Sequence, residues 1–125
     1  MDVTIEALLG KTLTRVQNND DEEIVFEASD GSAFRMYHRQ DCCEHVTVDQ
    51  IAGDLSDLIG APILFAEEAS SEVALIDRKY ADDSATWTFY KLTTRKGWVD
   101  IRWFGSSNGY YSESVDIVQT RAPSV

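Results

Sequence analysis

The residues best suited to chemistry gather in positions 38–45, which read HRQDCCEH. Histidine, cysteine and carboxylate side chains are all ligands that zinc accepts. The spacing argues against a metal, because the adjacent Cys42 and Cys43 rarely reach one tetrahedral ion together and the chain has no CxxC pair. We therefore expect no metal site. We also expect both thiols to be reduced and at least one to be buried, because a disulfide between neighbours is strained and no third cysteine exists.

His38 lies in the same segment and shares strand parity with Phe34 and Met36, so it is expected to point inward. A buried histidine satisfied by Asp41 or by a backbone carbonyl is one interpretation. The other places His38 at the floor of a ligand site.

Aromatic and arginine side chains form a second group over residues 86–104. Alternation puts Trp98, Arg102 and Phe104 on one face of a strand and Trp103 on the other. Such a face can stack a nucleobase and pair with a phosphate. It can equally fill a β core, with Arg102 paired to a nearby acid.

The segment 105–113, GSSNGYYSE, is richer than a turn requires. Asn108-Gly109 alone is an ordinary hairpin signal. Glu113 shares parity with Val115 and Ile117, and an inward carboxylate needs a partner, either Arg102 or a tyrosine hydroxyl. Structural pairing and ligand binding both remain open for this segment.

Composition narrows the function classes. The chain has 125 residues, 43% of them hydrophobic, and a net charge of −11, which fits one globular domain and excludes non-specific binding to nucleic acids or anionic membranes. We find no membrane-length apolar run and no basic leader, so we expect a cytoplasmic protein without a membrane partner. No hydrolytic triad motif, P-loop or dinucleotide fingerprint occurs, so we expect neither catalysis nor a cofactor.

Hydrophobic periodicity predicts an α+β domain over residues 1–119, with a frayed tail at 120–125. The main helix is expected at 47–59, because Thr47 and Gln50 fit a capping box, the apolar residues form one stripe, and Gly60 and Pro62 end it. An antiparallel sheet of six to seven strands, curled or folded into a sandwich, packs against this helix. The strands are predicted at 12–17, 22–28, 32–38, 63–66, 85–94, 98–104 and 111–119, with a polar loop at 67–83.

Several of these segments together resemble a family of small phage and prophage proteins classed as a domain of unknown function. The resemblance covers roughly residues 10–118 and is carried by 37–44 (YHRQDCCE), 53–55, 66–68, 86–90 (TWTFY), 96–97 and 101–113 (IRWFGSSNGYYSE). A phage setting implies a counter-defence protein that binds and sequesters a small nucleotide-type immune signal without cleaving it, as a homo-oligomer. The alternative is an acidic nucleic-acid mimic that binds a host defence protein through the carboxylates of Glu22, Glu23, Glu27, Asp49, Asp54 and Asp57.

The nucleotide hypothesis assigns roles to particular side chains. Arg102 is the phosphate partner, because its planar fork matches phosphate oxygens. Asn108 reads a base edge or a ribose hydroxyl, and aromatic rings stack the base. The full set of predicted ligand-binding residues is His38, Trp87, Tyr90, Arg102, Trp103, Asn108, Tyr110, Tyr111 and Glu113.

Overall fold

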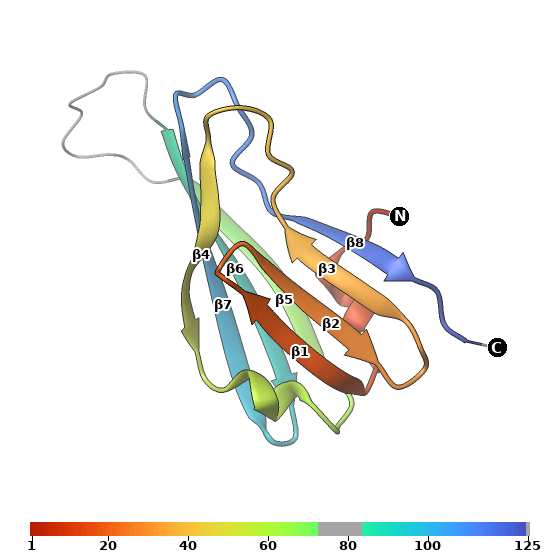
Figure 1. Cartoon of the computed structure of the whole chain (residues 1–125). Coiled ribbons are helices and arrows are strands. Elements are labelled where there is room, and N and C mark those ends of the chain that lie inside the picture. The colour runs from red at the N-terminus through yellow and green to blue at the C-terminus, as the bar shows by residue number, and fades with distance from the viewer. Residues whose placement is uncertain (73–83, 125) are drawn as a thin grey trace.

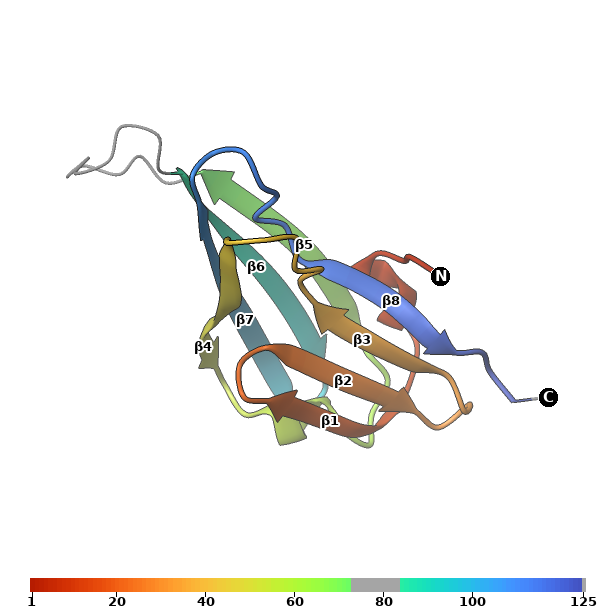
Figure 2. The same cartoon turned by 45° about the horizontal axis from the view of Figure 1, so that its top comes forward.

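The computed structural model, which describes residues 1–72 and 84–124, contains two four-stranded antiparallel sheets. Figures 1 and 2 show the two sheets as stacked layers. The first sheet has the order β1-β2-β3-β8, and its strands are β1 (Leu13–Asn19), β2 (Glu23–Ala28), β3 (Ala33–Tyr37) and β8 (Asp116–Arg121). The second has the order β4-β7-β6-β5, with β4 (His45–Ala52), β5 (Phe65–Glu72), β6 (Ser84–Thr94) and β7 (Gly97–Ser107).

The core lies between the sheets and follows the alternation of the strands. Phe26 and Phe34 face inward from the first sheet, and Trp103 and Leu92 face inward from the second. The short 3-10 helix η1 (Ile5–Leu8) adds Ile5 and Leu8 to this cluster. A sandwich of this kind needs no long helix, because each sheet covers the apolar face of the other.

The predicted helix at 47–59 is wrong, and with it the α+β class. Residues 45–52 form strand β4, paired with β7, and a 3-10 helix, η2 (Leu55–Leu58), follows. Val46 and Val48 are buried with a period of two, and a bulge after Val48 shifts the register. Gly53 then breaks any helix at its left-handed φ of +96°.

Other boundaries also differ from the prediction. Residues 67–72 belong to β5 rather than to a loop, and the rest of that predicted loop lies outside the described residues. Asn108-Gly109 does not close a hairpin, because β7 and β8 lie in different sheets. The predicted strand at 111–119 is replaced by β8, which starts at Asp116 and takes in the first two residues of the predicted tail.

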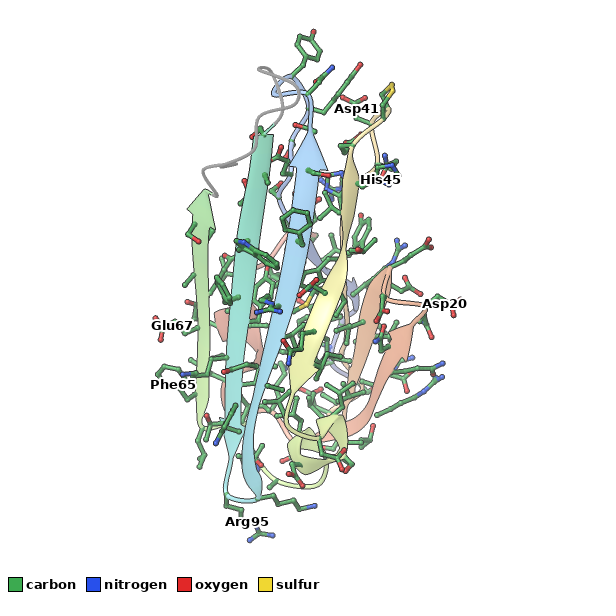
Figure 3. The ribbon with its side chains drawn as sticks, turned by 90° about the vertical axis from the view of Figure 1, so that its left-hand side faces the viewer. Asp20, Asp41, His45, Phe65, Glu67 and Arg95 are labelled. Carbon is green, nitrogen blue, oxygen red and sulfur yellow. A yellow bond between two sulfur atoms is a disulfide. The ribbon has the colours of Figure 1, made fainter. Side chains whose placement is uncertain are left out.

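The connections between the sheets are what position the site. Figure 1 shows segment 38–44, between β3 and β4, and segment 108–115, between β7 and β8, at the same end of the sandwich. Helix η2 and the tight β6–β7 hairpin lie at the other end, where Figure 3 labels Arg95. The two motifs singled out in the sequence are therefore brought together.

Candidate functional site

The predicted ligand-binding residues are divided among several places. Tyr90 and Trp103 are fully buried between the sheets, so no ligand can stack on them in the folded protein. The Tyr90 hydroxyl donates to Glu68 Oε1 at 2.6 Å, and the Trp103 indole N–H points at Met36 Sδ at 3.2 Å. Burial, together with the Glu68 contact, raises the pKa of Tyr90 far above its ordinary value.

Trp87 and Arg102 lie together on the outer face of the second sheet, which Figure 3 views with Phe65 and Glu67 at its β5 edge. The Arg102 guanidinium sits 4.8 Å from the centre of the Trp87 ring, which lies 4.6 Å from the ring of Phe104. Arg102 also donates to Asp49 at 2.6 and 2.9 Å and to Gln50 at 2.8 Å. The Arg102 side chain is therefore hydrogen-bonded to residues of β4 in the same sheet, and it is not the partner of Glu113.

His38 belongs to a buried network centred on Glu44. Its Nε2 lies 2.9 Å from Glu44 Oε2 and its Nδ1 lies 2.6 Å from the carbonyl oxygen of Ser114. The predicted carbonyl contact is present, but the carboxylate partner is Glu44 rather than Asp41. A carbonyl oxygen and an ionised carboxylate only accept hydrogen bonds, so His38 is the donor in each contact for which the facing ring nitrogen carries a hydrogen.

Glu44 holds segment 38–44 in shape. Its carboxylate also accepts from the backbone amides of Cys42 at 2.8 Å and Asp41 at 3.1 Å and from the side-chain amide of Gln40 at 3.0 Å. Burial by itself would raise the pKa of Glu44. The hydrogen bonds, first from the Cys42 amide and then from His38, outweigh burial and lower the pKa to about 2.

This pKa shift predicts a loss of stability in acid. Because the pKa of Glu44 falls from 4.5 to about 2 on folding, its contribution is complete above pH 4.5 and disappears as the pH drops toward 2. We expect urea unfolding of E44Q, compared with the wild type, to show a deficit at pH 7 that shrinks over this window. E67Q, which changes an exposed carboxylate, is the control. A wild-type and an E44Q protein with parallel pH profiles would contradict the assignment.

The cysteines do not have the predicted form. Cys42 and Cys43 are joined in a disulfide, which corrects the expectation of two reduced thiols. Both residues are exposed, contrary to the expectation that at least one is buried. Among the described residues, no group of three or more His, Cys, Asp or Glu side chains could hold a metal ion.

A hollow of about 400 Å³ lies between the inward face of β5–β6 and segment 111–115. Its volume lies in the range of about 300–1,000 Å³ typical of small-molecule sites. The lining residues are Glu68 and Ser70 of β5, Ser84, Thr86 and Thr88 of β6, and Tyr111, Ser112, Glu113, Ser114 and Val115 of the connection. We refer to it as the hydroxyl-lined hollow.

Glu113 is the charged centre of the hydroxyl-lined hollow and is only 9% exposed. Its Oε1 accepts from Thr86 at 2.7 Å and Ser84 at 3.2 Å, and its Oε2 accepts from Ser107 at 2.6 Å. Gly105 of β7 allows the backbone of Glu113 to lie close to the strand, because a Cβ at position 105 would be 2.8 Å from the carbonyl oxygen of Glu113. Within the described part of the chain, the side-chain partners of Glu113 are therefore hydroxyl groups.

A smaller hollow of about 240 Å³ lies on the outer face of the second sheet, the face to which Ala85, Phe104 and Ser106 belong. Asn108 lines this hollow, and Tyr111 lines both hollows, whereas Tyr110 is 83% exposed and stacks edge-on against Tyr111. The structure thus gathers Asn108, Tyr110, Tyr111 and Glu113 at one end.

Sequence reasoning missed Glu44, Glu68 and the hydroxyls of β6. The β6 hydroxyls had a readable signal, because Ser84, Thr86 and Thr88 alternate in phase with the inward Tyr90 and Leu92. Glu68 had no such signal, since residues 67–83 read as a polar loop.

No helix of the described residues has the length and apolar character to span a membrane. Neither the curated proteins nor the solved structures include a match to the chain. Residues 6–117 match a family model whose description is "Domain of unknown function (DUF7448)". Since the match covers most of the 125 residues, the chain belongs to the DUF7448 family.

Proposed function

We propose that this protein binds a small nucleotide-type signalling molecule in the hydroxyl-lined hollow and sequesters it without cleaving it. The observation that carries the proposal is the hollow itself, which combines about 400 Å³ of space with a buried carboxylate, surrounding hydroxyls and the ring of Tyr111. Hydroxyls and a carboxylate suit a sugar, and a tyrosine ring suits a base. The resemblance to phage proteins supplies the setting, a cytoplasmic counter-defence protein that removes a host immune signal.

We propose binding without cleavage because the candidate acid–base residues are buried and cannot reach a ligand. His38 and Glu44 form an acid–base pair, but their side chains are only 3% and 0% exposed and are saturated by internal partners. A general acid or base must come within hydrogen-bond reach of the reacting group. Arg102 is not part of the proposed site either, because it lies on the opposite face of the sheet.

The acidic-mimic alternative is not advanced, because three of its six carboxylates are paired with arginines of the same protein. Glu23 pairs with Arg35, Glu27 pairs with Arg15 and Asp49 pairs with Arg102. A mimic of a nucleic-acid backbone needs a continuous run of uncompensated charge.

The proposed binding is tested by calorimetry and thermal shift with cyclic dinucleotides, cyclic trinucleotides and cyclic ADP-ribose. A ligand present at about 100 times its Kd should stabilise the protein by about 2.7 kcal/mol. Chromatography after heating should recover the ligand intact. No shift with any of these nucleotides would refute the proposal, and recovery of cleaved ligand would make the protein an enzyme.

We also propose that the protein forms a homo-oligomer through the outer face of the second sheet. That face exposes Phe65, Phe89 and Trp98, at 42%, 39% and 55%. Large exposed apolar side chains on one face are typical of interaction surfaces. Light scattering of the same samples, with and without ligand, would give the mass, and a monomer at every concentration would contradict this part.

A further inference from the structure

The charge of the hydroxyl-lined hollow restricts which part of a nucleotide can enter it. Glu68 and Glu113 both line it, and the described lining includes no lysine, arginine or histidine. A phosphate entering here would meet two carboxylates with no compensating cation from the described lining residues, and like charges at close range in a partly desolvated space repel strongly. The described lining therefore favours a ligand orientation that keeps the phosphate outside.

Glu113 has capacity for one further hydrogen bond. A carboxylate offers about four acceptor sites, and Thr86, Ser84 and Ser107 occupy three of them. The Ser84 hydroxyl, whose hydrogen is donated to Glu113, can still accept a hydrogen bond, and the Ser112 hydroxyl, 2.7 Å from Ser114 Oγ, can act as donor or acceptor. A pair of adjacent hydroxyl groups on a ligand matches this arrangement, because one can donate to Glu113 while its neighbour exchanges hydrogen bonds with a serine.

We infer that the ligand carries an unsubstituted ribose 2′,3′-diol and that Glu113 is the residue that selects it. This inference rests on the proposed function and specifies its ligand class. An acidic side chain bonded to ribose hydroxyls is a common solution in dinucleotide sites. Ligands whose ribose 3′-oxygen is joined to a phosphate, as in 3′,3′-cyclic dinucleotides, lack the diol and bring negative charge to the hollow.

The test compares ligands on the unmodified protein. Calorimetry would use AMP, GMP, CMP, UMP and cyclic ADP-ribose, then the 2′-deoxy counterparts of the four monophosphates, and 3′,3′-cyclic di-AMP. We expect ligands with the diol to bind at least about tenfold more tightly than those without it, since a lost hydrogen bond to a charged group is worth roughly that factor. Equal binding of the deoxy ligands, or binding of the cyclic dinucleotide alone, would overturn the inference and leave the proposed function standing. No binding in either panel would overturn both.

Two variants test whether Glu113 is the residue responsible for the preference for ribose over deoxyribose. E113Q keeps the size of the side chain but removes its charge, and E67Q, on the outer face of β5, is the matched control. We expect E113Q to lose the preference for ribose over deoxyribose, while E67Q retains it. If Glu113 only supports the fold, E113Q will weaken both ligand classes by the same factor, which the ratio of the two affinities reveals.

Discussion

Replacing Trp103 with alanine is expected to lower the free energy of unfolding by about 3–5 kcal/mol, the usual range for truncating a buried aromatic side chain. Trp103 is fully buried and heads the largest buried side chains of the core. Its indole reaches across the sandwich to Met36 of β3, so the truncation removes a contact between the sheets as well as apolar area. Urea unfolding followed by circular dichroism measures the change.

Trp98 provides the matched control, because it is a tryptophan on the same strand that faces the other way. It is 55% exposed on the outer face of the sheet. At a protein concentration where light scattering shows a monomer, its replacement by alanine should change the stability by no more than about 0.5 kcal/mol, as is usual at the surface. Comparable losses in W98A and W103A would mean that the two faces of β7 have been assigned incorrectly.

Replacing Gly53 with alanine is expected to cost roughly 3 kcal/mol, although it adds only one methyl group. An L-residue at φ +96° costs about 1–2 kcal/mol. The new Cβ would also lie 2.5 Å from the carbonyl oxygen of Trp98, and relieving such an overlap with backbone typically costs about 1–3 kcal/mol more.

Gly10 separates the two contributions to this cost. It also has a positive φ, +78°, but a Cβ there would meet nothing within 4 Å. G10A should therefore lower the free energy of unfolding only by the conformational contribution. Thermal unfolding of both variants gives the difference, and a G10A protein as unstable as G53A would remove the steric explanation.

The strands could be predicted from the sequence where burial alternates cleanly. In β2 and β3, Phe26 and Phe34 lie on the inward face that alternation gave them. Segment 47–59 failed because its apolar residues fit a helical stripe as well as a strand followed by a turn. Two local signals favoured the strand: the β-branched Thr47 and Val48, and a glycine at position 53 inside the proposed helix.

The candidate site was predictable only in part, because parity assigns a side chain to a face but not to a partner. Glu113 was placed inward correctly, yet its partners come from β6 and β7 and are hydroxyls. The partner of His38 lies six residues along the chain at Glu44, and that pairing depends on the path of segment 38–44, which periodicity does not describe. Tyr90 and Trp103 were assigned to ligand stacking because strands are rich in aromatic residues whether these fill a core or line a binding site, and the sequence alone does not distinguish the two cases.

The pairing of β8 with β3 has a consequence for synthesis on the ribosome. Strands β1, β2 and β3 leave the exit tunnel early, but the neighbour that completes their sheet is the last strand of the described chain. Until it emerges, the edge of β3 presents unpaired amides and carbonyls, which are a template for pairing with other chains. Nascent or truncated chains that stop before Asp116 are therefore expected to be more prone to aggregation and proteolysis. Once β8 is present, its backbone pairs with the edge of β3.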